Sequence, residues 1–322
     1  MPSKELIVHS LLQNQWVHGT DLAETLGTSR TAIWNNITVL KNRGYDIESN
    51  QKEGYRLVSI PKFLYPELVK YKLGTSFIGR NIIHYMSTGS TNDDARELCN
   101  KGAHAGTVVI AEDQTKGRGR CNRSWTTSVG KSIAMSLILK PEGKKPREAY
   151  QFTMMTAAGI SDALMSFDVK NVSIKWPNDV LINGKKVAGI LTELNGEMDM
   201  IRQLIIGIGI NVNQDICDFG QTLPDATSVK IETGVTADRL RLIQTAIRCI
   251  DARYVQLMRH GFDDILNTLK QRCCSIGKKI HFNLAGAEGA VTVKDIASDG
   301  GLMVIDDSGN IKTLYSGDIQ FV

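Results

Sequence analysis

The order in which hydrophobic patterns follow one another constrains this chain most. Residues 1 to about 62 show helical spacing and then a hairpin pattern, whereas residues 63–274 mix strand-like runs with helical blocks. From residue 275 onward, short strand-like runs alternate with Gly, Asp and Ser turns. A length of 322 residues suits two or three domains. We therefore predict an α+β multidomain protein with domains at 1–62, 63–274 and 275–322.

Composition excludes several classes of protein. Hydrophobic residues make up 42% of the chain and charged residues 22%, as in ordinary globular proteins. No apolar run approaches the ~20 residues of a membrane span, and the N-terminus lacks a signal-peptide pattern. Six cysteines are scattered without a CxxC pair and six histidines without an HExxH motif, so we expect no metal cage of protein side chains. These features predict a cytoplasmic protein with reduced thiols and no membrane partner.

The first domain is predicted to be a winged helix-turn-helix. Thr20 or Asp21 can cap a second helix, Gly27-Thr28 makes a tight turn, and a third helix begins near Ser29. In such an arrangement the helix after the turn enters the major groove of DNA.

The outer face of the third helix suits DNA, because its side chains can donate hydrogen bonds to phosphates or base edges. The candidates are Ser29, Arg30, Thr31, Trp34, Asn35 and Thr38. Strand-like runs at 45–48 and 55–58 would add the wing. This domain has seven Lys or Arg and six Asp or Glu, so we expect DNA binding to depend on dimerisation, which doubles the phosphate contacts. A winged helix used for protein contacts is the alternative.

Helical runs in the second domain occur in blocks rather than after every strand. This favours one mixed sheet in an α+β domain over a doubly wound fold. The glycine alternation at 207–211 lacks the third glycine of a dinucleotide fingerprint and is followed by no helical run, which argues against a nicotinamide enzyme. The third domain has the pattern of a small closed or nearly closed β-barrel.

The most unusual stretch is 113–125, where cations alternate with glycines directly after an apolar strand. Flexible glycines let the backbone close over a ligand, and guanidinium groups pair with phosphate or carboxylate. The stretch is not a P-loop, because GxxxxGK[ST] is absent. A solvated basic loop or an RNA-binding patch is the alternative that composition allows.

Two further polar clusters lie near the ends of strand-like runs. Residues 175–179 (KWPND) and 185–189 (KKVAG) hold cations and a carboxylate that can converge across a hairpin. Residues 90–93 (STND) can cap a helix or offer hydrogen bonds to a polar ligand. Each cluster also has a structural reading, with Trp176 in the core, Asp179 in a turn and Lys185 in solvent.

Five motifs occur in a fixed order: SRTAIW, STND, QTKGRGRCNRSW, KWPNDVLINGKKVAG and GIGINVN. Followed by a small β-barrel, they resemble the family of bifunctional biotin protein ligases and biotin operon repressors over essentially the whole chain. The resemblance implies a class II synthetase-like catalytic domain and an SH3-like C-terminal barrel.

The resemblance also implies a two-step reaction. Biotin and MgATP give biotinyl-5′-AMP and pyrophosphate, and the adenylate then acylates a lysine of the biotin carboxyl carrier protein of acetyl-CoA carboxylase. ATP and Mg²⁺ are cosubstrates, biotin is the substrate, and no prosthetic group is expected. The family further implies a transcriptional repressor of biotin synthesis and transport genes, which binds biotin operator DNA as a homodimer with biotinyl-5′-AMP as corepressor.

The resemblance implies roles for individual residues. Arg118, Arg120 and Lys186 would stabilise the charge that builds up when a carboxylate meets a triphosphate. Asp179 would accept the proton of the acceptor lysine, whose ordinary pKa is about 10.4. Biotin or its adenylate would contact Ser90, Thr91, Asn92, Gln114, Arg118, Gly119, Arg120 and Lys186. Second-rank candidates for the nucleotide are Arg123, Trp125, Lys175, Asn178 and Asn211.

Apolar walls for the biotin ring and chain would come from Trp125 and the strand around Gly189. Cys121-Asn122 stands where some relatives carry an Arg-Gly pair, which lowers the charge of the loop. A lipoate or octanoate ligase is the rival enzyme, and it would need a longer, wholly apolar pocket. A ligand-sensing repressor without ligation is the non-enzyme rival, against which the intact Lys186 and Asp179 argue.

Overall fold

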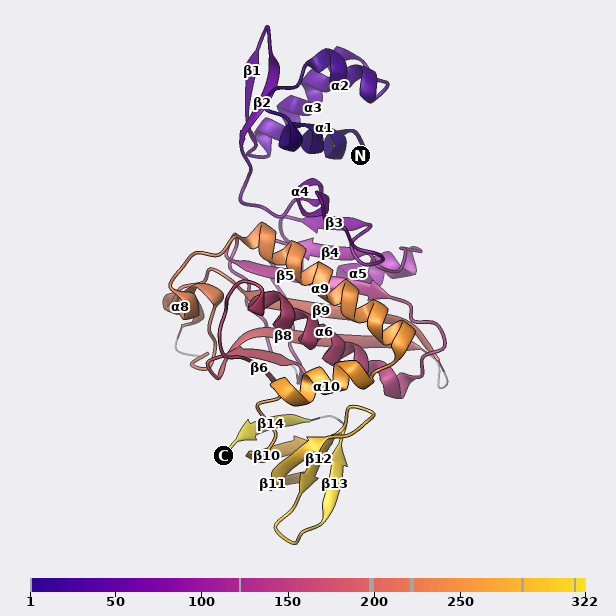
Figure 1. The fold of residues 1–322 in the computed structure, drawn as a ribbon, viewed down its shortest axis with the longest axis vertical. Coiled ribbons are helices and arrows are strands. Elements are labelled where there is room, and N and C mark those ends of the chain that lie inside the picture. Colours follow the sequence, from indigo (N-terminus) through magenta and orange to yellow (C-terminus); the bar gives the residue numbers. More distant parts are fainter. Residues whose placement is uncertain (1, 122, 197–199, 221–222, 285–286, 316) are drawn as a thin grey trace. The chain divides into compact units, whose positions relative to one another are not determined.

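The structure is a computed structural model that describes residues 2–121, 123–196, 200–220, 223–284, 287–315 and 317–322. The chain divides into two compact units, Met1–Leu73 and Gly74–Val322. Figure 1 shows the helices and strands of both units, coloured along the sequence.

The first unit contains helices followed by an antiparallel β-ribbon and a short further helix. Its elements are α1 (Pro2–Gln13), α2 (Gly19–Thr25), α3 (Arg30–Asn42), β1 (Asp46–Asn50), β2 (Gly54–Ser59) and α4 (Pro66–Lys70). Ser29 caps α3, because its side chain accepts a hydrogen bond from Ala32 N at 3.2 Å. Ile33, Ile37 and Leu40 are buried, as their spacing predicts. The helix-turn-helix and its ribbon are therefore confirmed.

The predicted cap of α2 is wrong. The N-cap is His18, which makes no side-chain cap hydrogen bond, and Thr20 donates instead to Asp21 Oδ1 at 3.2 Å. Val17 and Tyr55 exchange two backbone hydrogen bonds of 2.9 Å. The helix α2 follows this bridge directly, so it begins before the predicted cap residues Thr20 and Asp21.

The short helix α4 packs with the first unit through a buried carboxylate. Glu67 accepts hydrogen bonds from Tyr45 Oη at 3.0 Å and from Arg43 Nη1 at 3.2 Å, and its backbone oxygen lies 2.9 Å from His9 Nε2. Burial and the Glu67 carboxylate raise the pKa of Tyr45, so the phenol stays protonated and donates. These contacts extend the first compact unit to Leu73, beyond the expected boundary at residue 62.

The second unit is built on a seven-stranded sheet with the order β3-β4-β5-β9-β8-β7-β6. Its strands are β3 (Ile82–Tyr85), β4 (Val108–Ala111), β5 (Ser132–Leu139), β6 (Val172–Lys175), β7 (Asp179–Ile182), β8 (Lys185–Gly196) and β9 (Ile201–Asn211). β3 and β4 run parallel and the other neighbouring pairs are antiparallel. The predicted mixed sheet of an α+β domain is thus confirmed.

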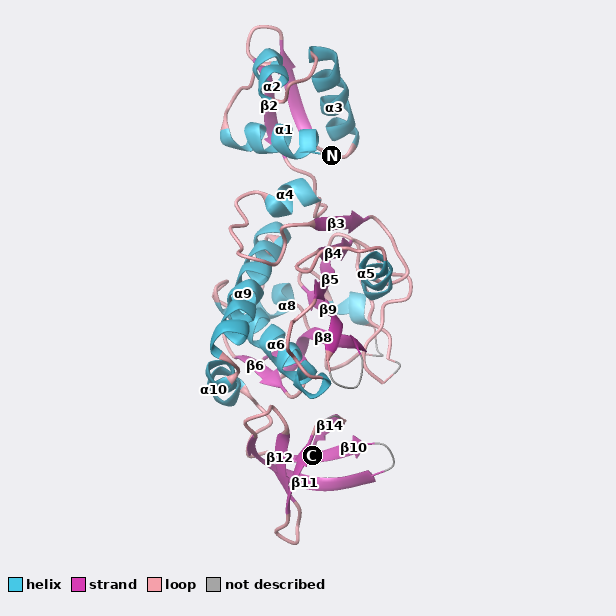
Figure 2. Cartoon of the chain, turned by 90° about the vertical axis from the view of Figure 1, so that its right-hand side faces the viewer, coloured by secondary structure: helices cyan, strands magenta, loops and turns pink. Residues whose placement is uncertain are grey.

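Helices lie on both faces of this sheet (Figure 2). α6 (Ala149–Met165) and α9 (Arg239–His260) pack together on one face, so closely that a Cβ on Gly159 would lie 3.0 Å from Ile250 Cα. α5 (Thr91–Asn100) covers part of the other face, where Ala95 and Cys99 pack against apolar side chains of β4, β5 and β9. The remaining helices are a 3₁₀ turn (Pro146–Glu148), α7 (Ile216–Phe219), α8 (Val229–Thr233) and α10 (Asp263–Arg272).

The C-terminal strands form a five-stranded antiparallel sheet with the order β13-β12-β11-β10-β14. They are β10 (Lys279–Leu284), β11 (Ala287–Ile296), β12 (Leu302–Ile305), β13 (Ile311–Leu314) and β14 (Asp318–Phe321). Residues 314 and 318 span at most about 14 Å, whereas five flat strands would place the two edges ~19 Å apart, so the sheet must curl. Within the described residues, however, β13 and β14 remain unpaired edges, and a closed barrel is not observed.

The buried carboxylate of Glu67 predicts a stability effect. E67A should destabilise the first unit by about 1–3 kcal/mol, because the hydroxyl of Tyr45 would remain buried without an acceptor. Hydrogen exchange of α3, β1 and α4 measures this, with the exposed Glu24 as the matched control in E24A. Equal protection in E67A and E24A would contradict the anchoring of α4.

Candidate functional site

A pocket lies on the α5 face of the sheet, where the central strands carry small residues. In the register of β5, β9 and β8, Ser136 pairs with Gly207, and Gly209 pairs with both Ala134 and Gly189. Alternate residues of a strand point to the same face, so these positions together form a floor with almost no side chains.

Two larger side chains occupy the space that the glycines leave. A Cβ on Gly209 would overlap the indole of Trp125, and a Cβ on Gly207 would overlap the amide of Asn92. The GIGINVN motif, one of the five motifs of the family resemblance, therefore marks the places where neighbouring side chains approach the backbone of β9. Trp125 lines the pocket.

The polar wall of the pocket comes from the first turn of α5. Thr91 donates from its backbone N at 2.8 Å and from its hydroxyl at 3.0 Å to Gln114 Oε1. Asn92 accepts from Ser136 Oγ at 2.6 Å and donates to Glu193 Oε2 at 3.0 Å. Both residues are almost completely buried, and so is Ser90.

Two groups of this wall are available to a ligand. Ser90 occupies the N-cap position of α5 but makes no side-chain cap hydrogen bond. Gln114 uses its Oε1 for Thr91, while its Nε2 makes no hydrogen bond within the described residues. The pocket therefore offers a hydroxyl and an amide donor to a polar group.

Two cations, Lys186 and Arg120, also line the pocket. Lys186 Nζ lies 2.7 Å from Asp179 Oδ1, a close charge contact outside hydrogen-bond geometry, and 5.8 Å from the centre of the Trp125 ring. Arg120 donates to Asn178 Oδ1 at 2.8 Å and to Gly317 O at 3.1 Å. The KWPND and KKVAG motifs thus converge across the β7–β8 hairpin, as predicted.

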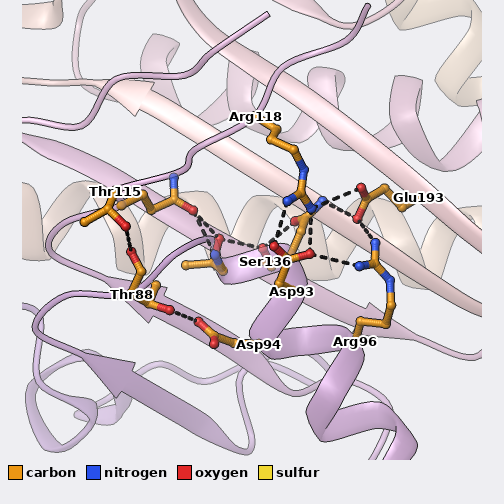
Figure 3. A network of polar contacts seen from close by, with 11 residues as sticks. Thr88, Asp93, Asp94, Arg96, Thr115, Arg118, Ser136 and Glu193 are labelled. Atoms are coloured by element: carbon orange, nitrogen blue, oxygen red, sulfur yellow. Dashed lines mark hydrogen bonds and ion pairs between the residues drawn. The ribbon is translucent and has the colours of Figure 1, made fainter. Parts of the chain in front are cut away.

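Arg118 belongs to a network of four charged residues (Figure 3). Its Nη1 and Nη2 donate to the two carboxylate oxygens of Asp93 at 2.6 and 2.7 Å, and Nη2 lies 3.5 Å from Glu193 Oε1. Arg96 contacts the same two carboxylates at 2.9 and 2.7 Å. The hydrogen bonds from Arg118 lower the pKa of Asp93, so the carboxylate is ionised at neutral pH.

Most predicted site residues meet in this one pocket. Its lining comprises Ser90, Thr91, Asn92, Gln114, Arg118, Gly119, Arg120, Trp125, Asn178, Lys186, Gly189, Ile190, Leu191, Gly207, Ile208 and Gly209. Asp179 adjoins it through Lys186.

Three second-rank candidates are not brought to the pocket. Arg123 is exposed, and Lys175 Nζ lies 5.1 Å from the ring centre of Phe321. Asn211 is buried, donates to Thr227 O at 3.0 Å and accepts from Gln214 Nε2 at 3.0 Å, so its amide already serves the fold. A nucleotide role for these three stays a prediction.

The sequence analysis placed Asp93 in the STND cluster but did not connect it with Arg118, and it missed Arg96 and Glu193. Glu193 could have been found, because it continues the alternation of Gly189 and Leu191 along β8 and so shares their face. Asp93 and Arg96 lie about one hundred residues away on α5, and no local pattern indicates that they reach Glu193.

The outer face of α3 presents the predicted DNA-binding residues. Ser29, Arg30, Thr31 and Asn35 are exposed, and Trp34 is 59% exposed. Thr38 is partly exposed and donates to Trp34 O at 2.9 Å.

Within the described ranges, no group of three or more His, Cys, Asp or Glu side chains could hold a metal ion. None of the helices in those ranges has the length and apolar character needed to span a membrane.

Family models match all three regions of the chain. An HTH domain matches residues 4–56, the biotin/lipoate A/B protein ligase family matches residues 86–211, and the biotin protein ligase C-terminal domain matches residues 275–322.

Curated relatives and solved structures agree with these matches. The chain is 37% identical to the bifunctional ligase/repressor BirA of Bacillus subtilis over 320 residues, which cover 98% of each chain. It is 31% identical to the biotin–[acetyl-CoA-carboxylase] ligase of Mycobacterium tuberculosis over 267 residues, 80% of this chain and 96% of that one. The biotin protein ligase from Aquifex aeolicus in complex with biotin and ATP aligns with a TM-score of 0.66 at 28% identity, covering 76% of this chain and 99% of that one.

The close contact between Gly209 and Trp125 predicts a local effect of a larger residue. G209V should displace the indole towards solvent, shift tryptophan emission to longer wavelength and cost about 1–3 kcal/mol of stability, because the site is already filled. A Cβ on Gly89 would meet nothing within 4 Å, so G89A is the matched control. Emission unchanged in G209V would contradict the packing of Trp125 on β9.

Proposed function

Because the chain belongs to the family of bifunctional biotin protein ligases and repressors, we propose that the pocket on the α5 face is where biotin and ATP react. The carboxylate of biotin attacks the α-phosphorus of MgATP, giving biotinyl-5′-AMP and pyrophosphate. The amine of an acceptor lysine on the biotin carboxyl carrier protein of acetyl-CoA carboxylase then attacks the acyl carbon, and AMP leaves.

What supports this site most is the meeting of Lys186 from β8 and of Arg118 and Arg120 from segment 117–121 with Ser90 and Gln114 in one pocket. Joining a carboxylate to a triphosphate brings anions together, and fixed cations stabilise the charge that develops. We assign Lys186 to the acyl phosphate, because it extends from the floor strand β8 over the ring of Trp125.

Asp179 is our candidate for the proton acceptor in the second step. The amine of the acceptor lysine is mostly protonated at neutral pH and must lose a proton to become a nucleophile. Asp179 lies at the Lys186 end of the pocket, where the acyl phosphate would lie. A carboxylate placed there can orient the incoming amine and take its proton.

The polar end of the pocket favours biotin over a lipoyl chain. The ureido ring of biotin has two N–H donors and a carbonyl, which a wholly apolar pocket would leave unpaired. The Ser90 hydroxyl and the Gln114 amide can pair with such a ring, whereas the dithiolane of lipoate has no group for them.

The first unit supplies the repressor function. Its α3 face meets operator DNA, and we propose that biotinyl-5′-AMP promotes a homodimer that doubles the phosphate contacts. By linkage, DNA then raises dimerisation as much as dimerisation raises DNA affinity. We also propose that residues 275–322 are an SH3-like module, since their five antiparallel strands form a curled sheet.

The role of Lys186 gives a direct test of ligation. K186A should lower ATP-dependent transfer of labelled biotin to a carrier domain by at least ~100-fold, the effect of removing one well-placed charge donor. Lys185 precedes it on β8 and is exposed, so K185A is the matched control and should transfer normally. Normal transfer by K186A, or no transfer by the wild-type chain, would contradict the assignment.

The division into compact units gives a second test. Deleting residues 1–73 should remove operator binding and leave adenylate formation largely intact, because the pocket lies within Gly74–Val322. Deleting only residues 1–62 should give a less soluble protein, since the buried Leu64, Leu68 and Val69 would lose their cover. Gel filtration, operator binding and pyrophosphate release measure these effects. Loss of adenylate formation on deleting 1–73 would refute the independence of the two units.

A further inference from the structure

The segment 117–121 is held over the pocket by its two arginines. Arg118 donates to Asp93 of α5, whereas Arg120 donates to Asn178 and to the carbonyl of Gly317. The segment also bonds to the chain that follows it, since Gly119 N donates to Arg123 O at 2.7 Å. Segment 117–121 is therefore held at two places, by Asp93 through Arg118 and by Asn178 and Gly317 through Arg120.

Both terminal nitrogens of the Arg118 guanidinium contact carboxylates of the protein. Both Nη atoms bind Asp93, and Nη2 also lies near Glu193 (Figure 3). Arg96 contacts both carboxylates, so two cations balance two anions. Such a bidentate, networked pair fixes geometry better than an isolated surface ion pair does.

We propose that Asp93 is a positioning residue that anchors Arg118 and thereby slows release of the adenylate. This proposal rests on the proposed function of the pocket. Arg118 then acts as a strap between segment 117–121 and α5, and Lys186 remains the cation that meets the acyl phosphate. The role differs from direct contact between Arg118 and the adenylate, which the family resemblance implied.

The helix α5 does not depend on this carboxylate for its own formation. Asp94 also lies in its first turn, where a negative charge favours the helix, and it accepts from Thr88 Oγ1 at 2.7 Å. The side chain of Asp93 is 46% exposed, so a neutral isostere there leaves no buried group unpaired. A substitution of Asp93 can therefore change adenylate retention without unfolding α5.

The test compares D93N, R118Q and the double variant in the full chain. Each protein is loaded with a non-hydrolysable phosphodiester analogue of biotinyl-5′-AMP, and its dissociation is followed after a chase. We expect about three- to tenfold faster release from D93N and from R118Q, the range for losing a bidentate ion pair within a network. The double variant should release no faster than either single variant, because both remove the same contact.

Two controls isolate the anchor. Glu97 lies one turn further along α5 and, within the described residues, forms an ion pair with Lys101 alone, so E97Q removes the same charge from the same helix and should retain the analogue like the wild type. D93E keeps the charge and should restore part of the retention. Trypsin should cleave after Arg118 faster in ligand-free D93N than in E97Q, because the anchor of that segment is lost.

Several results would overturn the proposal. Wild-type retention in D93N together with leakage in R118Q would show that Arg118 acts on the ligand itself, and additive effects in the double variant would show two separate contacts. Dissociation of the analogue requires no turnover. A wild-type chain that holds the analogue but transfers no biotin would therefore contradict the proposed function while leaving the anchor in place.

Discussion

The pocket exists because the central strands carry only small residues at its floor. Gly189, Gly207 and Gly209 lie on the same side of β8 and β9, and α5 covers only part of that side. The indole of Trp125 fills the space above Gly209 and so becomes a wall. A side chain at either β9 glycine would displace the groups that shape the pocket, so every contact described above depends on these bare positions.

The polar groups around this floor are held by one another before any ligand arrives. The Asn92 amide accepts a hydrogen bond from Ser136 and donates one to Glu193, and these two bonds fix its orientation in the wall of the pocket. Thr91 saturates Gln114 Oε1, which leaves its amide nitrogen as the donor for a ligand. A network fixed in this way loses little conformational entropy on binding, and this favours specific recognition of a small polar ring.

The sequence was informative where chemistry is local and uninformative where distant segments meet. The motifs around Gln114, Arg120 and Lys186 identify residues that line the pocket, because they lie in the segment after β4 and at the start of β8, two strands whose patterns can be recognised. The ion network of Arg118 joins α5 to β8, and nothing in either segment specifies the other. Nor does the motif indicate that the Asn211 amide donates to Thr227 O inside the fold.

The ends of the domains were harder to predict, because they depend on tertiary contacts. The two prolines at 61 and 66 indicate a linker. Glu67, which follows them, is nevertheless buried and accepts hydrogen bonds from Tyr45 and Arg43 of the same compact unit. In the C-terminal sheet the strands are visible as short apolar runs between turns. Whether their edges close depends on curvature and register, which a pattern of alternating residues does not encode.

Glycine carbonyls connect the C-terminal sheet to the catalytic region. Arg120 donates to Gly317 O, and the indole nitrogen of Trp176 donates to Gly300 O at 3.0 Å. Gly317 and Gly300 have φ values of 123° and 97°, a region that residues with a side chain rarely adopt. The C-terminal module therefore reaches Arg120 at the pocket through a backbone carbonyl, at a position whose backbone conformation favours glycine.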